Sequence, residues 1–576
     1  MKQALVASGL TLGCLALAVS CASDPVSRAQ PDANSDAAPI NLPNLPPPGD
    51  GGGALPTRPG EDPATCDEAA VSRTYLGCEF WPTVTYNPVD QTFDFAVVVS
   101  NPQTVDAAVT VTGGPFGDTY ELAVKPGGTG RLALPWVPAL KATTPGEAVG
   151  SVKVRRGAYR MVSSVPVVAY QFNPLQFKGG PDSWPAGKDW SACKIEAPYD
   201  SCYSFTNDAS LLLPSTALTG NYRVYGGFSQ SLYRRSGDGD AGPGRILGIA
   251  ETFAAITATQ PNTSVGIKLG NQARVTAGPG VPAAARGSTM NFVMDVGDVV
   301  LLSTTEFGTD LSGSLIAADK PVQVISGMQC AQFPFDTYAC DHVEESLFPV
   351  ETLGKHYFVA PPTSPLGASA GMMVRFHGNV DNTKLTYFPS KPPACPEVIQ
   401  AGENLNCGDF STAAGVVNIP FEVIGDHEFA VTTYQLGSQY VDTESPGVLG
   451  DPSQSQPVAV EQFRRNYTFL TPRDYVISVV DIVYPADAKL MLDGIPVDAA
   501  LSAWDTIDGG NPLFAPTPIS NGYVLRRVPL DNSKNDAHTL TGDKPFGIQV
   551  MGYGAYTSYQ YPGGLNLGVI ADVPVK

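Results

Sequence analysis

The chain has 576 residues, of which 43% are hydrophobic and only 16% are charged. Its 59 glycines and 52 prolines are typical of a turn-rich, secreted β protein and argue against a helical cytosolic one. The net charge of −20 argues against a nucleic-acid binder, because no basic stripe is present to neutralise phosphates. The length allows about three to five domains.

The N-terminus is typical of an exported lipoprotein. Residues 1–20 begin with Met1-Lys2 and continue as an apolar run that ends in small residues, which predicts a signal peptide. The segment Ala18-Val19-Ser20-Cys21 is similar to the lipobox of bacterial lipoproteins, so Cys21 is the expected lipidation site. Ordinary signal cleavage near Ala22 is the alternative.

Residues 21–65 are rich in Pro, Gly and Asp, and they are predicted to form a disordered linker between the lipid and the folded part. No later run reaches the roughly 18 apolar residues of a membrane helix. Membrane attachment is therefore expected through lipid alone. Cys21 is followed by Ala22-Ser23 rather than by Asp, and by resemblance to enteric lipoproteins this favours the outer membrane or cell surface.

Residues 66–576 contain four related pairs of passages. Each pair opens with an alternating β-branched hairpin. It closes with an apolar strand that is interrupted by a polar turn, often with a Pro. The opening passages begin at residues 93, 253, 372 and 475. The closing passages are residues 157–170, 313–327, 419–434 and 538–554.

This pattern predicts an all-β fold with about four tandem antiparallel β-sandwich-like repeats. The units recur at roughly 105–160 residues, which is too long for one propeller blade and suits a sandwich of about seven strands. A propeller-like ring of repeats is the alternative. The approximate repeats are residues 66–190, 191–340, 341–445 and 446–576.

Eight cysteines follow Cys21, and they fall into four close pairs in a chain that is expected to reach an oxidising compartment. No CxxC-type spacing suggests a zinc site. Nearest-neighbour disulfides are therefore predicted, with the pairs Cys66–Cys78, Cys193–Cys202, Cys330–Cys340 and Cys395–Cys407.

The segment from Cys340 to Glu345 looks most like a chemical site. Asp341, His342, Glu344 and Glu345 could hold a divalent metal or supply an acid/base pair, although their spacing is not that of a helical HExxH site. The segment is expected to be a loop that enters a strand. The alternative is that Asp341 and His342 only bond loop backbone beside a disulfide.

Three other patterns have simpler interpretations. The GxSxG sequence at residues 367–371 precedes a strand rather than a helix, so it predicts a hairpin loop and not a nucleophile elbow. Acidic segments near residues 237–242 and 505–511 fall short of a Ca²⁺ loop and are predicted to be solvated turns. Aromatic residues at 80–81, 170–172 and 553–561 could form a binding face, but core positions are favoured.

Several short segments share their order with a known family. They are residues 75–81 (Tyr-Leu-Gly-Cys-Glu-Phe-Trp), 93–101, 207–215, 311–321, 340–342 (Cys-Asp-His) and 544–547 (Lys-Pro-Phe-Gly). From about Thr74 to Leu565 the chain resembles the N-terminal domain of IgGFc-binding proteins. The resemblance implies adhesion or ligand binding outside the cytoplasm, and it supplies no catalytic residues.

The sequence as a whole predicts a lipid-anchored extracytoplasmic binding or adhesion protein that recognises a protein or glycan. No enzyme activity, cofactor or nucleic-acid partner is expected, and the membrane is contacted only through the lipid. One alternative is a secreted metal-dependent hydrolase that uses Asp341, His342 and Glu344. A purely structural envelope protein is the other.

Overall fold

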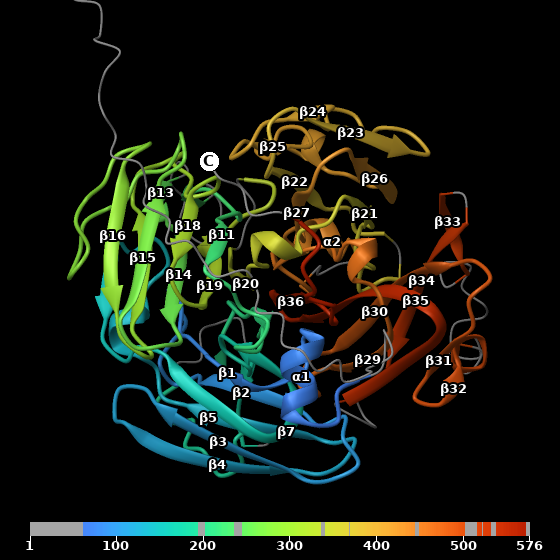
Figure 1. Cartoon of the computed structure of the whole chain (residues 1–576), viewed down its shortest axis with the longest axis horizontal. Helices are drawn as coiled ribbons and strands as arrows, with labels where there is room; N and C mark the ends of the chain where they lie inside the picture. The colour runs from blue at the N-terminus through green and yellow to red at the C-terminus, as the bar shows by residue number, and fades with distance from the viewer. Residues whose placement is uncertain are drawn as a thin grey trace, which may run out of the picture. The chain divides into compact units, whose positions relative to one another are not determined.

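The chain is nearly all antiparallel β-structure, as its sequence predicts (Figure 1). The computed structural model describes residues 62–181, 183–193, 202–234, 245–335, 340–367, 369–443, 448–501, 515–520, 522–531 and 537–571. Cys21, the signal peptide, most of the linker and both acidic segments lie outside these residues. The short helical elements include α1 (Cys66–Ser72), η1 (Pro138–Leu140), η2 (Val350–Thr352), η3 (Ala413–Gly415), α2 (Ser438–Val441) and η4 (Val460–Gln462).

The four closing passages run across two sheets. The first and last are single long strands, β7 (Tyr159–Phe172) and β35 (Ala537–Gly554). The second and third are each split by a polar turn, which gives two strands in place of one. These are β18 (Leu315–Ala318) with β19 (Val322–Ala331), and β26 (Phe421–Gly425) with β27 (Phe429–Tyr434).

One pairing scheme recurs four times in the described part of the chain. The opening strand pairs with the second half of the closing passage, and the strand after it pairs with the first half. The opening strands are β2 (Phe95–Ser100), β14 (Thr252–Ala258), β22 (Met373–Gly378) and β30 (Ile477–Pro485). The strands after them are β3 (Ala107–Gly113), β15 (Thr263–Lys268), β23 (Thr383–Phe388) and β31 (Leu490–Leu492).

A fourth strand pairs with the end of each closing passage, and we call these four the inner strands. They are β10 (Ala209–Leu211), β20 (Asp341–Ser346), β28 (Gln454–Ser455) and β36 (Thr557–Pro562). They contact one another in a closed cycle, β10 with β20, β20 with β28, β28 with β36, and β36 with β10. This cycle favours the ring alternative over a string of separate sandwiches. The repeat boundaries themselves remain predictions.

The remaining strands extend these sheets outward. In Figure 1, β20 and β36 lie toward the middle of the view, while β4, β16 and β24 lie near its edges. The first sheet is completed by β1 (Gly77–Phe80), β4 (Asp118–Val124) and β5 (Thr129–Leu134). The second pair of sheets is completed by β6 (Val152–Val154), β11 (Asn221–Arg223), β16 (Thr289–Met294) and β17 (Val299–Thr304).

We call each opening strand, with the strand after it, its closing passage and its inner strand, a set. The third and fourth sets are arranged in the same way as the first two. The third is completed by β21 (His356–Val359), β24 (Val398–Ile399) and β25 (Asn404–Asn406). The fourth is completed by β29 (Arg464–Leu470), β32 (Ile495–Pro496), β33 (Thr517–Ser520) and β34 (Tyr523–Leu530). Two small ribbons pair β8 (Lys178–Gly179) with β9 (Cys202–Tyr203), and β12 (Gln230–Arg234) with β13 (Arg245–Ala250).

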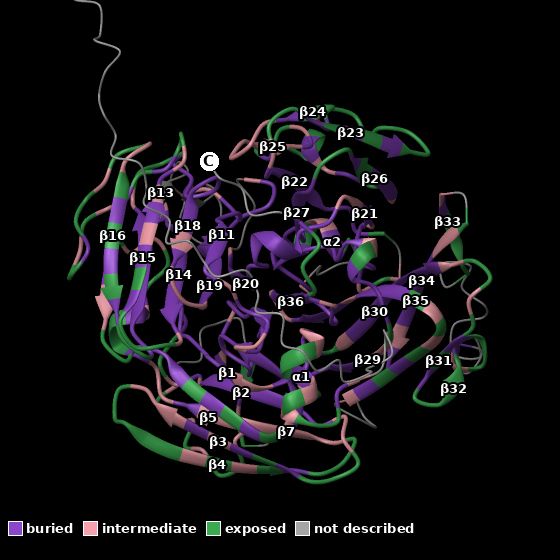
Figure 2. Cartoon of the chain, in the orientation of Figure 1, coloured by how far each residue is buried: buried purple, intermediate pink, exposed green. Residues whose placement is uncertain are grey.

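Burial separates the two kinds of strand. The opening strands β14 and β22 and the closing strands β19 and β27 are buried on both faces. In contrast, β16 and β23 alternate between buried and exposed residues, and Figure 2 shows the exposed positions along β16. This is why the opening strands read as continuous apolar runs and the outer strands as alternating ones. The largest hydrophobic cluster includes Tyr170, Ile256, Ala430 and Val480, so all four sets share one core.

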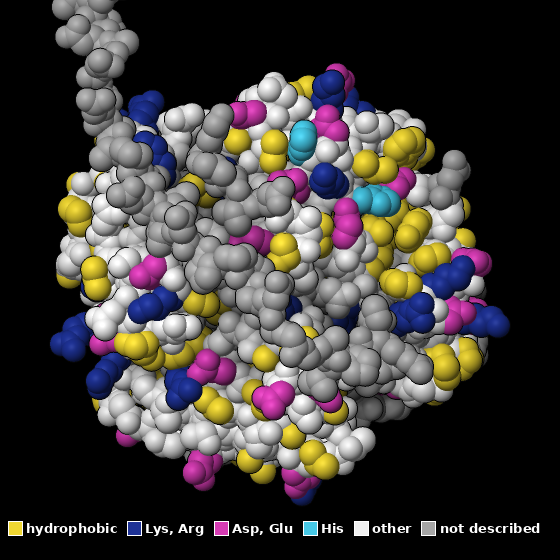
Figure 3. Space-filling view, in the orientation of Figure 1, with side chains coloured by type: hydrophobic (Ala, Val, Ile, Leu, Met, Phe, Trp, Pro, Cys, Tyr) yellow, Lys and Arg dark blue, Asp and Glu magenta, His cyan; other side chains and the backbone are white. Residues whose placement is uncertain are grey.

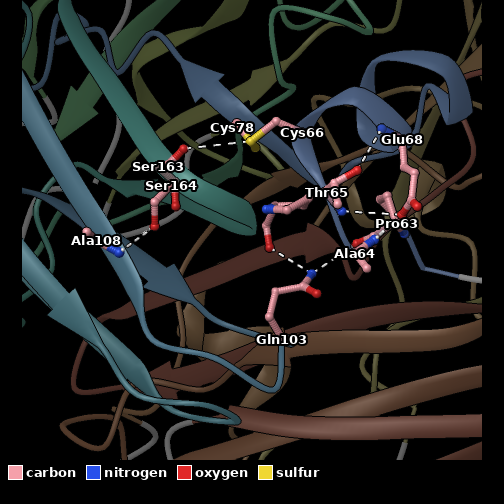
Figure 4. The surroundings of a disulfide bond; sticks show 11 residues. Pro63, Ala64, Thr65, Cys66, Glu68, Cys78, Gln103, Ala108, Ser163 and Ser164 are labelled. Atoms are coloured by element: carbon pink, nitrogen blue, oxygen red, sulfur yellow. Dashed lines mark hydrogen bonds between the residues drawn. A yellow bond between two sulfur atoms is a disulfide. The ribbon is translucent and has the colours of Figure 1, made fainter.

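The structure contains four disulfides, and they are the four pairs that the spacing predicts: Cys66–Cys78, Cys193–Cys202, Cys330–Cys340 and Cys395–Cys407. The first joins α1 to β1 (Figure 4). Helix α1 begins at a capping box, in which Thr65 Oγ1 accepts from Glu68 N at 3.2 Å and the Glu68 carboxylate accepts from Thr65 N at 3.3 Å. These bonds satisfy backbone donors that would otherwise be unpaired at the helix start.

The first described segment is joined to the last one. Tyr75 N donates to Leu565 O at 3.2 Å, and Leu567 N donates to Arg73 O at 2.7 Å. The contact between these two segments is stabilised by Arg464 on β29, whose side chain is 1% exposed. Its guanidinium pairs with Asp62, donates to Asn566 Oδ1 and lies over the Tyr75 ring at 5.3 Å.

We expect Arg464→Ala to lower the free energy of unfolding by about 3 kcal/mol, because it removes a buried side chain together with its bonds to Asn566 and to the partly exposed Asp62. Arg465→Ala is the matched control, since Arg465 is exposed on the same strand and surface substitutions change stability by about 0.5 kcal/mol or less. Denaturant unfolding of both variants is the measurement. Equal stability of the two variants would contradict the assigned role of Arg464.

Candidate functional site

The four candidate residues lie in strand β20 and not in a loop, which corrects the expectation from the sequence. Asp341, His342, Glu344 and Glu345 are each 0% exposed. Strand β20 pairs with β19 on one side and contacts β10 and β28 at the centre of the inner strands. Its polar residues are therefore surrounded by protein on both faces, where each polar atom needs a partner.

His342 lies in a hydrogen-bonded cluster. Its Nε2 is 3.0 Å from Thr85 Oγ1, 3.2 Å from Glu344 Oε2 and 3.3 Å from Asn173 Nδ2. Its ring is stacked on Phe253, with centroids 5.7 Å apart and planes 8° apart. Glu344 lies on the same strand, while Thr85, Asn173 and Phe253 come from other parts of the chain, so the His342 ring contacts side chains and not the loop backbone of the simpler alternative.

Glu344 is held by the same cluster. Its Oε1 accepts from Gln171 Nε2 at 2.7 Å, and its Oε2 accepts from Asn173 Nδ2 at 3.0 Å and from the Thr85 hydroxyl. A carboxylate that accepts several hydrogen bonds is stabilised in the interior. The cluster thereby ties β20 to the end of β7 and to the segment that follows β1.

Two other buried carboxyls, those of Asp208 and Asp341, accept hydrogen bonds mostly from backbone N–H groups. Asp208 Oδ2 accepts from Glu344 N at 2.9 Å and from Gln454 N at 3.4 Å, so it links β10 with β20 and β28. Asp341 Oδ2 accepts from Thr557 Oγ1 at 3.1 Å and from Ser558 N at 3.4 Å, which links β20 with β36. These bonds hold the cycle of inner strands together.

Burial has the largest effect on the pKa values of the carboxyls among the inner strands. It raises the pKa of Asp208, Asp341, Glu345 and Asp451 well above their ordinary values, because the charged form loses its hydration. The carboxyls of Asp451 and Asp208 raise the pKa of Asp341 further. Among the described residues, no Lys or Arg forms an ion pair with any of these four carboxyls.

The geometry does not suit catalysis on a dissolved substrate. A general acid or base must reach the substrate within hydrogen-bond distance, and all four residues of β20 are fully buried. Within the described ranges, no three His, Cys, Asp or Glu side chains gather as metal ligands. The site instead has the features of a polar core that positions strands.

A small pocket lies elsewhere, between the third and fourth sets of strands. Its polar wall includes Thr433, Asp481, Gln549 and Gln560, and its free volume is about 30 Å³. A cavity of that size holds about two water molecules. None of the four candidate residues of β20 lines it.

The structure also describes most of the GxSxG segment and the aromatic segments. Ser369 is exposed and β22 follows it without a helix, which agrees with the hairpin-loop interpretation of this segment, although Ala368 lies outside the described residues. The aromatic positions favoured as core are buried: Phe80, Trp81, Tyr170, Phe172, Tyr553, Tyr559 and Tyr561.

Sequence reasoning missed Asp208 and Asp451. A signal was present, because both residues are followed two positions later by Ser and six positions later by Pro, in 208–214 and 451–457. That pattern marks the start of two inner strands. Read singly, however, each Asp looks like part of a solvated turn.

The family of this chain follows from its comparison with known proteins. Residues 208–552 match the family model described as IgGFc binding protein, which is more than half of the chain. The chain belongs to the IgGFc-binding protein family. The human IgGFc-binding protein (Homo sapiens) is 42% identical over 78 residues, which is 14% of this chain and 1% of the human protein. The family is described by the binding of a protein rather than by a reaction.

We expect His342→Ala to lower the free energy of unfolding by about 3 kcal/mol, since it opens a cavity beside Phe253 and leaves Thr85 and Glu344 short of a partner. His427→Ala is the matched control, because His427 is exposed. Thermal melting of the two variants is the measurement. A wild-type melting temperature for His342→Ala would show that the cluster does not stabilise the fold.

Proposed function

We propose that this protein is a lipid-anchored extracytoplasmic binding protein and that its partner is another protein. Membership of a family described by protein binding is the observation that carries the proposal. The Ser20-Cys21 pair at the end of the apolar leader supports the lipid anchor. The four disulfides support an oxidising compartment. The described residues include no helix that is long and apolar enough to cross a membrane.

The outer face of the sheet β21-β26-β23-β24 is the best candidate for the contact surface. Val398, Phe388 and Ile424 are exposed on neighbouring strands of this sheet. Thr386 pairs with Ile424, and Lys384 pairs with Val398, so these residues share one face. Figure 3 shows hydrophobic side chains over the region of β23 and β26.

The chemistry of this face favours a protein over a glycan. Two of its three exposed apolar residues, Val398 and Ile424, are aliphatic, and Phe388 is the aromatic one. Apolar residues that share a face with polar ones are typical of protein contact sites, which are about as apolar as the rest of a protein surface. Here Lys384 lies opposite Val398, and the His356–Glu422 pair, whose Nε2 and Oε1 atoms are 2.6 Å apart, lies opposite Ile424 and Phe388.

We expect Phe388→Ser with Ile424→Ser to weaken binding to a protein partner at least about tenfold, because truncating central apolar contacts costs about 1–2 kcal/mol each. Val293→Ser is the matched control, since Val293 is 64% exposed on β16 in another sheet. Full-length Cys21→Ser protein would be applied to immobilised IgG Fc, an extracellular-protein array and a glycan array. Saturable binding to glycans only, or equal loss in both variants, would contradict a protein-binding face.

Lipidation is tested separately. Metabolic labelling with an alkyne palmitate should tag the wild-type chain and leave Cys21→Ser untagged, because the acyl chain is carried on that cysteine. Fractionation should place the wild type in the membrane pellet and the variant in the soluble fraction. Equal labelling of both proteins would show that Cys21 is not the anchor.

A further inference from the structure

Two carboxyls of the inner strands, Asp341 and Asp451, lie on either side of Ser558 and together leave three buried oxygens without a partner. Asp341 begins β20, and Asp451 lies three residues before β28; both are 0% exposed. Ser558 on β36 lies between them. Its backbone N donates to Asp341 Oδ2 at 3.4 Å, and its Oγ accepts from Asp451 N at 2.9 Å.

Three of the four oxygens of these two carboxyls lack protein partners. Asp341 Oδ1 and both carboxyl oxygens of Asp451 are buried and accept no hydrogen bond, and Ser453 Oγ, two residues after Asp451, is also unpaired. An ionised carboxylate without hydrogen bonds is very costly in a protein interior unless an opposite charge compensates it. The ion pairs among the described residues bring no Lys or Arg to Asp341 or Asp451.

We propose that a Ca²⁺ ion binds between Asp341 and Asp451 and joins β20 to the segment that leads into β28. The unpaired atoms are all oxygens, which Ca²⁺ prefers, and neither His nor Cys is required. Ca²⁺ takes about six to eight oxygen ligands, so hydroxyl or carbonyl oxygens and water complete the shell. A site with only two carboxylates is compatible with the lack of a three-residue His, Cys, Asp and Glu group in the described ranges.

The ion would neutralise two carboxyls at the point where three of the four inner strands meet. It therefore acts as a cross-link between segments that are about a hundred residues apart in the chain, 341 and 451. A ligand that binds only the folded state raises its stability. Binding and thermal stability should thus respond together to Ca²⁺.

The test uses full-length Cys21→Ser protein that has been treated with EGTA and dialysed. Calorimetric titration with CaCl₂ should show one bound ion per chain, and the melting temperature should rise on addition of millimolar Ca²⁺. Asp451→Asn keeps the shape of the side chain and removes its charge, so it should lower Ca²⁺ affinity at least tenfold and abolish the shift in melting temperature. Asp118→Asn, at an exposed position, should behave as wild type.

The wild-type titration alone can overturn the proposal. No bound Ca²⁺ and no change in melting temperature would mean that protons, rather than a cation, neutralise the pair. Equal Ca²⁺ binding by wild type and Asp451→Asn would place the ion elsewhere. If Asp451→Asn does not fold, Asp341→Asn provides the same comparison from the opposite side of the site.

Discussion

Carboxyl groups at the centre of this protein are removed from water, and that constraint governs how the four sets of strands are joined. A buried polar group without a partner costs free energy comparable to a lost hydrogen bond. Two of the buried carboxyls, Asp208 and Asp341, take partners from other inner strands. Asp208 bonds the backbone of β20 and β28, and Asp341 bonds β36. The inner strands therefore stabilise one another only when all of them are in place.

The same constraint explains why the sets resemble sandwiches locally but are not independent. The two halves of each closing passage pair with strands of two different sheets. The passage is either one long strand, such as β35, or two strands, such as β18 and β19. The apolar core continues from set to set. Backbone bonds between residues 73–75 and 565–567, together with Arg464, then connect the first described segment to the last. Short-range disulfides reinforce individual turns rather than this long-range closure.

Local features of the chain could be predicted from its sequence, because they depend on neighbours in the sequence. The alternating strands, the polar turns of the closing passages and the four disulfide pairs are of this kind. The environment of residues 340–345 was not predictable in the same way. A run of Asp, His and Glu reads as a solvated loop, and only its pairing with β19 and its contacts with Thr85 and Asn173 make it a buried strand. Asp451 was missed for the same reason, since its neighbours in space are distant in sequence.

Strand β20 is a buried structural strand and not an accessible site. Hydrogen–deuterium exchange, read by mass spectrometry on peptides that cover residues 341–346, tests this assignment most directly. We expect these amides to exchange as slowly as those of β14 and to become labelled only with global unfolding. Exchange as fast as in the exposed turn at residues 381–382 would contradict it, and would restore an accessible loop as the explanation for this segment.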